Sequence, residues 1–360
     1  STREDDKDKA GEGGEVVDKT SEKSIDELNE EFSDLLEEGK KKIEEIKEQA
    51  EKRRKEEKDK KETLEADREH RESKASAIRK TEIHQGVTLH SRKIEINDYT
   101  ESEYNEAYEL VQPYIRRTTK SIQKVLNYRK SREKLRGRKR GKLDGKNLHK
   151  VGFGDNRVFY KKNVNQPNIA MHLLIDQSGS MCALDGSGTH MTRIDRARQA
   201  AVLFRQVLKK LKIPHAIWGY SAYFNQPVAM SWEYVNYSNW ETRDDNVLGA
   251  IDYYEDNRDG YNIRLACDEL KDRPEQKKIL LVISDGAPHH RQKNYRMDRA
   301  LKDTKKAVNE CKKIHITPIG MSIGTRHSHV QRIYKNNICV NELSELNKKV
   351  ARELKRHILG

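Results

Sequence analysis

Two aspartates stand directly after apolar stretches of the chain, and one of them is followed by serines at alternate positions. Met171–Ile175 leads into Asp176–Ser180 (DQSGS), while Ile279–Ile283 leads into Ser284–Gly286 (SDG). Carboxylates and hydroxyls without Cys or His form a hard-oxygen ligand set that suits Mg²⁺, or another divalent cation such as Mn²⁺ or Ca²⁺. A single D-x-S-x-S segment is common in polar loops, so the prediction of a metal site depends on both segments.

The elements that must position these residues follow a rhythm of strand, loop and helix from Asn168 onward. Strands are expected at Ile169–Ile175, Ala216–Tyr220, Val228–Trp232 (as an edge strand), Lys277–Ser284, Ile316–Ile323 and Ile338–Val340, and helices at Arg193–Leu211, Arg264–Leu270, Asp298–Lys313 and Glu342–Ile358. This alternation predicts an α/β fold, a doubly wound, mostly parallel sheet with helices on both faces. Ligands of such sheets bind beyond the carboxyl ends of the strands.

The N-terminal half has a different composition, and four regions are predicted along the chain. Residues 1–21 should be a disordered acidic tail and 22–80 a charged helical arm or linker, with an apolar stripe from Ile25 to Ile46. Residues 81–165 should form a helical and basic lead-in, and 166–360 the α/β domain. In the lead-in, 81–96 is expected as a loop or a short strand pair and Glu101–Arg136 as a helix that kinks or restarts at Pro113. Residues 1–75 are expected to be dispensable for folding.

Charge is concentrated in patches, although the chain as a whole carries +13. Residues 1–40 hold 6 basic and 15 acidic side chains, whereas residues 121–150 hold 12 basic and 2 acidic ones. The basic stretch Arg129–Lys150 could contact an acidic partner surface, bind nucleic acid nonspecifically, or be a solvated linker. Stacking on bases would be limited to Tyr128 in this stretch. Candidate partner-binding residues are Arg136, Arg138, Lys139, Arg140 and, beside Asp285, His289.

Cysteine usage and hydropathy bear on the compartment. The four cysteines, Cys182, Cys267, Cys311 and Cys339, have no C-x-x-C spacing, so we expect reduced, mostly buried thiols. No apolar run approaches the length of a membrane span. These features predict a cytoplasmic protein with no membrane partner.

Several motifs resemble those of von Willebrand factor A (VWA) domains. Asp176–Ser180 matches the D-x-S-x-S signature of their metal-ion-dependent adhesion site, and Ser284–Gly286 matches their second acidic turn. More closely, Gly141–Asp144, Asn257–Gly260 and Arg273–Gln276 are similar to segments of the VWA subunit of aerobic cobaltochelatase and of the related nitric-oxide-reductase activation proteins. The resemblance covers roughly residues 100–360.

The resemblance implies a role and a ligand set. Metal ligands would be Asp176, Ser178, Ser180 and Asp285, with Asp259 replacing the threonine that most VWA domains supply from the middle loop. Members of this family are adaptors rather than enzymes, and they couple a MoxR-type AAA+ ATPase to a third, target protein for metal insertion or metalloenzyme activation. This sequence also lacks the G-x-x-x-x-G-K-[ST] motif of an ATPase. The alternative is a stand-alone metal-dependent interaction module that also binds nucleic acid through its basic stretch.

Overall fold

The computed structural model describes residues 25–132, 134–162, 168–186, 188–323 and 328–340, together with 345, 348–350, 352–353 and 356–357. The chain divides into two compact units, residues 1–68 and residues 69–360. The predicted tail at 1–21 and most of the predicted helix Glu342–Ile358 lie outside the described residues.

The first unit contains the N-terminal part of a long helix, α1 (Ile25–Arg79). Three apolar side chains of the predicted stripe, Leu36, Ile43 and Ile46, are 50%, 56% and 65% exposed. None of the side chains described in this unit is buried. The helix therefore gains nothing from a core here, and its charged residues interact with solvent or with one another, as Lys42 does with Glu38.

The second unit is built on a seven-stranded sheet with the order β1-β7-β6-β5-β8-β9-β10. Its strands are β1 (Thr88–Arg92), β5 (Ile169–Asp176), β6 (His215–Ala222), β7 (Val228–Val235), β8 (Lys277–Ile283), β9 (Ile316–Ile323) and β10 (Asn337–Val340). All neighbouring pairs are parallel except β6 and β7, which are antiparallel. The central strand β5 is buried along its whole length, as its apolar sequence predicts.

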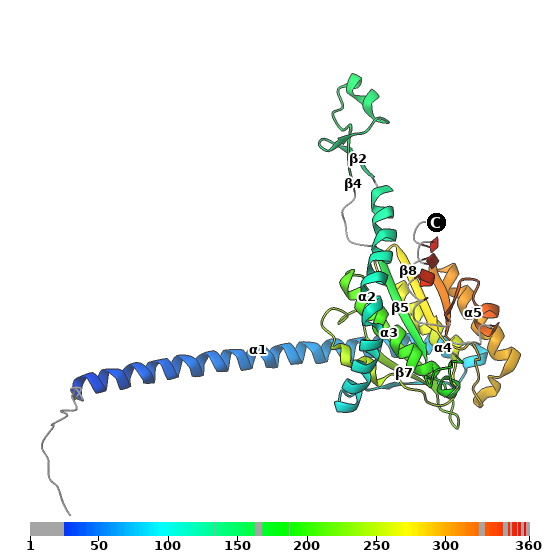
Figure 1. Ribbon diagram of the computed structural model, residues 1–360, viewed down its shortest axis with the longest axis horizontal. Helices are drawn as coiled ribbons and strands as arrows, with labels where there is room; N and C mark the ends of the chain where they lie inside the picture. Colours follow the sequence, from blue (N-terminus) through cyan, green and yellow to red (C-terminus); the bar gives the residue numbers. More distant parts are fainter. Residues whose placement is uncertain are drawn as a thin grey trace, which may run out of the picture. The chain divides into compact units, whose positions relative to one another are not determined.

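Helices cover both faces of this sheet (Figure 1). Side chains of β5 alternate between two cores, because successive residues of a strand point to opposite faces. Met171, Leu173 and Ile175 pack with α2 (Asp98–Arg132) and α3 (Arg193–Lys210). Ala170 and Leu174 pack with α4 (Asp259–Lys271) and α5 (Met297–Lys313). The predicted doubly wound, mostly parallel α/β fold is thereby confirmed.

Two expectations about the order of elements were wrong. The segment 81–96 forms a 3-10 turn, η1 (Glu82–His84), followed by the single strand β1, which pairs in parallel with β7. β7 is therefore not an edge strand, because β1 lies outside it. The helix α2 runs through Pro113 without a restart, and the other expectation for this residue, a kink, stays a prediction. Its buried stripe, including Val111 and Ile115, packs against the sheet side of the domain and holds the helix together.

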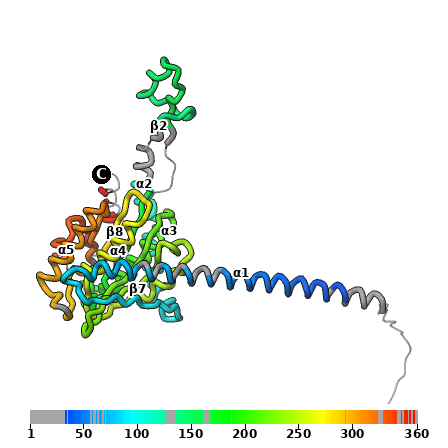
Figure 2. Tube along the Cα trace, turned by 180° about the vertical axis from the view of Figure 1, so that it is seen from behind, coloured from blue at the N-terminus to red at the C-terminus, as the bar shows by residue number. Residues whose placement is uncertain are grey.

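The last turns of α1 belong to the second unit rather than to a dispensable arm. Ala75 and Ile78 are buried in the same core as α4 and α5. Lys74 Nζ lies 2.8 Å from a carboxylate oxygen of Glu269 on α4, and Arg71 forms an ion pair with Glu233 on β7. Figure 2 shows this part of α1 crossing the face of the domain near α4 and β7. Residues 69–75 therefore add packing and ion pairs to the second unit, and the expectation that the chain folds without residues 1–75 stays a prediction.

The basic stretch does not continue α2 to Arg136, because the helix ends at Arg132. Residues from Lys134 onward form a small antiparallel sheet of order β2-β4-β3, with β2 (Lys134–Arg138), β3 (Lys142–Leu143) and β4 (Phe159–Lys162). A 3-10 helix, η2 (Leu148–Phe153), lies between β3 and β4. Gly137, Gly141 and Gly154 have positive φ angles, a conformation that other residues rarely adopt, and so they permit this chain path.

The cysteine prediction was wrong for one pair. Cys267 on α4 and Cys311 on α5 are buried and form a disulfide, with Cα atoms 5.9 Å apart. Sequence spacing could not indicate this pair, because 44 residues separate the two cysteines and only the packing of the two helices brings them together. Cys182 is an exposed free thiol and Cys339 a partly exposed one. Reduced cysteines therefore no longer support a cytoplasmic location. Across the described residues, no helix is long and apolar enough to cross a membrane.

Candidate metal site

β5 delivers Asp176 to the carboxyl edge of the sheet, where the chain turns into a short 3-10 helix, η3 (Gly179–Cys182). Asp176 is fully buried, and its Oδ1 atom accepts a hydrogen bond of 2.9 Å from the backbone N–H of Ser178. Gly179 allows a close approach in this turn. A side chain at this position would meet the carbonyl oxygen of Tyr254 at 3.2 Å. The loop is therefore folded back tightly over the Asp176 carboxylate.

The two hydroxyls of the D-x-S-x-S segment face each other. Ser178 Oγ and Ser180 Oγ lie 3.1 Å apart. Ser178 is buried, whereas Ser180 is exposed, so this pair of oxygens reaches from the interior of the site to the surface of the domain. A ligand from outside would approach the site on the side of Ser180.

Two other segments meet at the second oxygen of Asp176. The hydroxyl of Ser284, at the end of β8, donates to Asp176 Oδ2 at 2.7 Å, and the amide of Asn257 donates to the same atom at 3.1 Å. Ser284 in turn accepts a hydrogen bond from the N–H of Gly286, whose φ of 76° turns the chain. The structure thus brings the ends of both predicted strands and the middle loop to one carboxylate.

Asp285 is held by an arginine from α3. Arg193 Nη1 donates to Asp285 Oδ2 at 2.8 Å and to the carbonyl oxygen of Ser180 at 3.1 Å. Both side chains of the ion pair are buried. Arg193 therefore joins the acidic turn after β8 to the D-x-S-x-S loop after β5.

Asp259 begins α4 and is also buried, with 1% of its surface exposed. Its Oδ1 atom has no hydrogen-bond partner in the part of the chain that the structure describes. Burial, followed by the negative charge of Asp176, raises the pKa of Asp259 well above its usual value, although the Tyr220 hydroxyl opposes the shift. Burial, followed by the charge of Asp285, raises the pKa of Asp176 to about 6. Three carboxylates therefore repel one another in a region of low polarity.

The middle loop that carries Asp259 is fixed by the residue before it. Arg258 is fully buried, and its guanidinium lies 4.6 Å from the centre of the Tyr295 ring. It donates to His290 Nδ1 at 2.6 Å, to the carbonyl oxygen of Ile83 at 3.0 Å and to that of Gln292 at 2.8 Å. The guanidinium thus connects η1, the middle loop and the segment that follows Asp285.

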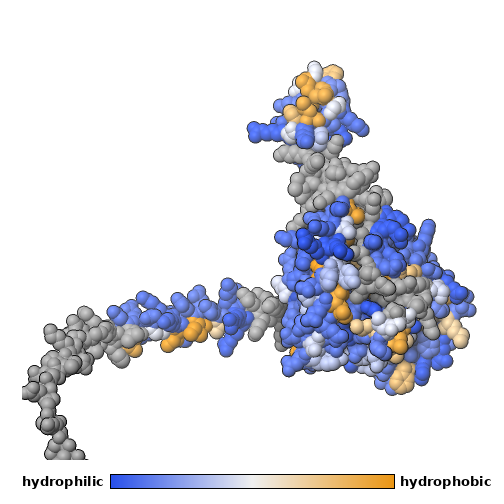
Figure 3. Space-filling model, viewed as in Figure 1, coloured by the Kyte–Doolittle hydropathy of each residue, from blue (hydrophilic) through white to orange (hydrophobic). Residues whose placement is uncertain are grey.

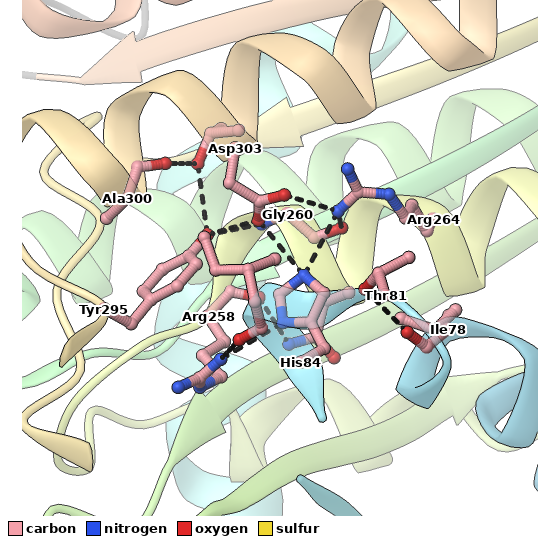
Figure 4. Close-up of polar contacts among 12 residues, drawn as sticks. Ile78, Thr81, His84, Arg258, Gly260, Arg264, Tyr295, Ala300 and Asp303 are labelled. Carbon is pink, nitrogen blue, oxygen red and sulfur yellow. Dashed lines mark hydrogen bonds and ion pairs between the residues drawn. The ribbon is translucent and has the colours of Figure 1, made fainter. Parts of the chain in front are cut away.

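A second set of contacts holds the start of α4 (Figure 4). The hydroxyl of Tyr295 accepts a hydrogen bond of 3.1 Å from the N–H of Gly260 and donates one of 3.0 Å to Asp303. Asp303 also lies 3.1 Å from His84 Nε2 and 2.9 Å from Arg264 Nη1. A side chain at Gly260 would collide with the Asp303 carboxylate, which would have to leave its present position. These contacts leave the backbone around Asp259 little freedom to move.

The residues at this edge fit a hard divalent cation. No group of three or more His, Cys, Asp or Glu side chains in the described parts of the chain is arranged to hold a metal by itself, so the Ser178 and Ser180 hydroxyls would be needed as ligands. A cation would give the Asp259 Oδ1 atom a partner and would offset the repulsion among the carboxylates. The donor set contains only oxygen, which favours Mg²⁺, Mn²⁺ or Ca²⁺ over softer metals.

The predicted partner-binding residues lie in two places. His289 lies at the candidate metal site, because its backbone N–H donates to Asn257 at 2.6 Å, and its side chain is half exposed. Arg136, Arg138, Lys139 and Arg140 belong to the small sheet instead, where Arg136 forms an ion pair of 2.5 Å with Asp144. The structure therefore does not join these four residues to the candidate metal ligands.

Sequence reasoning missed the residues that hold the candidate ligands in place. Asn257 and Ser284 stood within the quoted motifs, but nothing in their spacing indicated that both would donate to Asp176. Arg193 is the first residue of α3 and follows a long loop, so no local pattern connected it with Asp285. An arginine at a helix start close to a predicted metal loop was the one available signal.

Parts of the chain are similar to known proteins. Residues 247–360 match the model of a family described as the cobalamin biosynthesis protein CobT VWA domain. Over 200 residues the chain is 31% identical to the uncharacterized protein YojO of Bacillus subtilis (strain 168). The matched region covers 52% of this chain and 29% of YojO. The chain thus spans less than a third of the length of this curated relative.

Among solved structures, the conserved hypothetical protein BatB from Bacteroides thetaiotaomicron is 14% identical, with a TM-score of 0.37, over 53% of this chain and all of that one. The SpRpn10 VWA domain is 18% identical, with a TM-score of 0.34, over 50% of this chain and 93% of that one. A von Willebrand factor type A protein from Catenulispora acidiphila is 12% identical, with a TM-score of 0.35, over 54% and 43%.

The parallel sheet, the helices on both faces and the D-x-S-x-S loop at the end of β5 define a VWA domain. Within this class, residues 247–360, which include Asp259 and Asp285, are similar to the CobT VWA-domain family. The predicted resemblance to the cobaltochelatase VWA subunit is confirmed for this segment.

Proposed function

We propose that the VWA domain carries a metal-dependent docking face, in which Asp176, Ser178, Ser180, Asp285 and Asp259 hold a divalent cation, Mg²⁺ in the first place. When bound, the cation would act as an electrophile that accepts a carboxylate from a partner protein. The chain's own residues bind the ion, orient the hydroxyls and exclude water from the buried side of the site. The protein would then be an adaptor with no catalytic centre of its own.

One observation carries this proposal. The Asp259 Oδ1 atom is buried without a hydrogen-bond partner among the described residues, next to a second buried carboxylate, Asp176. An unpaired buried charge costs several kcal/mol, and proteins retain such a group where a ligand or a proton neutralises it. Ser180 gives this cluster a route to the surface. A cation at the strand ends would satisfy both features.

The adaptor role rests on the family. The CobT VWA domain indicates a cobaltochelatase-like VWA subunit. We propose that this chain couples a MoxR-type AAA+ ATPase to a third protein, for metal insertion or for activation of a metalloenzyme. This division of labour agrees with the sequence, because its 360 residues contain no phosphate-binding G-x-x-x-x-G-K-[ST] motif, and ATP hydrolysis would belong to the partner.

Calorimetry and pull-down with the cognate MoxR-type ATPase test the proposal. Mg²⁺ should bind the wild-type chain, and the ATPase should be retained with Mg²⁺ but not with EDTA. Asp176→Ala should abolish both effects and keep the fold, because Asp176 is the last residue of β5 and the apolar side chains of the strand are unchanged. Asp155→Ala, which removes a carboxylate of the small sheet, is the matched control and should behave as wild type. Retention of the ATPase by Asp176→Ala, or in EDTA, would show that the metal face is not the docking surface.

A further inference from the structure

The small sheet formed by residues 134–162 has almost no core of its own. Of the side chains described between Arg136 and Tyr160, only Asp144 and Val158 are buried. A three-stranded antiparallel sheet normally needs a hydrophobic face packed against another layer, such as a helix, to be stable. One buried valine supplies very little of this packing. The second layer of this sheet is therefore missing from the described part of the chain.

The apolar side chains that such a layer would cover are exposed. Leu143, Leu148, Val151 and Phe153 are 59%, 46%, 54% and 87% exposed. They lie within a segment of 11 residues, Leu143 on β3 and the other three on η2. Figure 3 shows apolar side chains gathered on this part of the molecule, with hydrophilic ones around them. Contiguous apolar patches with a polar rim are typical of interaction sites.

The rim of the patch is strongly basic. Residues 134–162 contain 11 Lys and Arg against two Asp. Both carboxylates already have arginine partners, because Asp144 pairs with Arg136 and Asp155 with Arg157. Arg138, Lys139 and Arg140 are exposed, and no other acidic side chain is available to them within this segment. A partner that covers the apolar patch must therefore bring negative charge to its rim.

We infer that the face formed by Leu143, Leu148, Val151 and Phe153, with its rim of Arg138, Lys139 and Arg140, is a docking site for an acidic amphipathic helix of a partner protein. The apolar side of the helix supplies the missing layer, and its acidic side pairs with the basic rim. Nucleic acid matches less well, because three of the four exposed apolar residues are aliphatic and cannot stack on bases. This docking site is separate from the metal face and does not require a bound cation.

The test uses the full chain in the presence of EDTA, so that the result is independent of the metal face. The probe is a fluorescent synthetic peptide with leucines at helical three- and four-residue spacing and glutamates elsewhere, followed by anisotropy. Binding should weaken at least about tenfold in Phe153→Ser, since Phe153 is the largest and most exposed of the four apolar side chains and a few large side chains carry most of the affinity of an interface. Combined serine substitutions at Arg138, Lys139 and Arg140 should weaken binding and remove its salt dependence.

Controls distinguish docking at this patch from unspecific binding elsewhere on the chain. Met297→Ser removes an 86% exposed apolar side chain from α5 and should bind as wild type. All substituted residues are exposed, and an unchanged thermal melt would verify that each variant folds. A peptide with glutamine for glutamate, anionic lipid vesicles and single-stranded oligouridine are compared in parallel, and each should bind more weakly. The inference fails if the acidic peptide does not bind, if Phe153→Ser binds it equally well, or if vesicles or oligouridine bind more tightly through the same residues.

Discussion

Removing divalent cations should destabilise the VWA domain, by an amount that depends on pH in a defined direction. Burial, followed by the charge of Asp285, raises the pKa of Asp176 from 3.8 to about 6. A shift of this size corresponds to roughly 3 kcal/mol between the two protonation states. In the metal-free protein the folded state therefore binds a proton more tightly than the unfolded chain does. The stability that comes from this protonated Asp176 is fully present below about pH 4, and it is lost as the pH rises through about 6 and the carboxyl group ionises.

Magnesium should reverse this trend, because the cation and the proton compete for the same carboxylates. At about one hundred times its dissociation constant, a ligand that binds only the folded state adds about 2.7 kcal/mol. We expect urea melts in Mg²⁺ and in EDTA to coincide near pH 4.5, where Asp176 is protonated, and to separate by about this amount near pH 7.5.

Asp259→Asn provides a sharper test, because the amide keeps the shape of the side chain and removes its charge. Burial, followed by the charge of Asp176, raises the pKa of Asp259, so the two carboxylates destabilise each other when no cation is present. The variant should be more stable than wild type in EDTA near neutral pH, and its response to Mg²⁺ should be reduced. Asp155→Asn, in the small sheet, should change neither quantity.

Two results would contradict these expectations. If wild-type melts in Mg²⁺ and EDTA coincide near pH 7.5 at every Mg²⁺ concentration tested, the cluster does not hold the ion. If Asp259→Asn is less stable than wild type in EDTA, then other contacts of the Asp259 carboxylate stabilise the fold by more than its repulsion from Asp176 destabilises it. The first result would contradict the proposed metal site, and the second would contradict the argument that repulsion between Asp176 and Asp259 favours a bound cation.

Three further predictions concern the fold. His172 is fully buried, and burial lowers its pKa to about 3, so the stability it contributes as a neutral side chain is present above about pH 6.5 and is lost as the pH falls toward 3. Between pH 7.5 and pH 5, the free energy of unfolding from urea melts should fall by roughly 2 kcal/mol more for wild type than for His172→Leu, and equal losses would contradict the lowered pKa. The Cys267–Cys311 disulfide closes a loop of 44 residues, so a reductant should lower the free energy of unfolding of wild type by about 4 kcal/mol and leave that of the double alanine variant unchanged. A wild-type melt that is identical with and without reductant would argue against the disulfide. A chain beginning at residue 69 should keep its cooperative melt, whereas a chain beginning at residue 80 lacks the buried Ala75 and Ile78, and its melting temperature should be lower by several degrees. Equal melting temperatures of the two chains would mean that the last turns of α1 contribute no packing energy.

The sequence predicted best where a single strong local pattern decides the structure. Ile279–Ile283 is apolar at every position, and only a strand buried on both faces explains such a run, so β8 and the aspartate after it could be placed. The same logic placed β5 and Asp176. The helix α3 was predicted to within one residue at its C-terminal end, because its apolar residues recur at helical spacing.

Elements that depend on distant partners could not be found in this way. β1 has the sequence TLHSR and is mostly exposed, so it has no apolar alternation, and only its pairing with β7 makes it a strand. The end of α2 at Arg132 has no local stop signal, because the first glycine after it is Gly137. Within the site, Arg193 could be linked to Asp285 only through tertiary packing, which brings the start of α3 to the acidic turn after β8 and joins residues 92 positions apart.

The two proposed docking surfaces depend on different physical terms, and this difference makes them separable in one chain. The metal face depends on a cation that neutralises buried carboxylates, so chelation should abolish it, while salt should affect it weakly because Asp176 and Asp259 are shielded from solvent. The small sheet depends on exposed Arg138, Lys139 and Arg140 around Phe153, so salt should weaken it and chelation should not. A partner that binds both surfaces would lose affinity both on chelation and in high salt. Its affinity for the chain would far exceed that of either contact alone, because the first contact raises the effective concentration for the second. The proposed role, an adaptor that joins an ATPase to its target, needs two such independent contacts, and the two proposed surfaces lie on two different sheets.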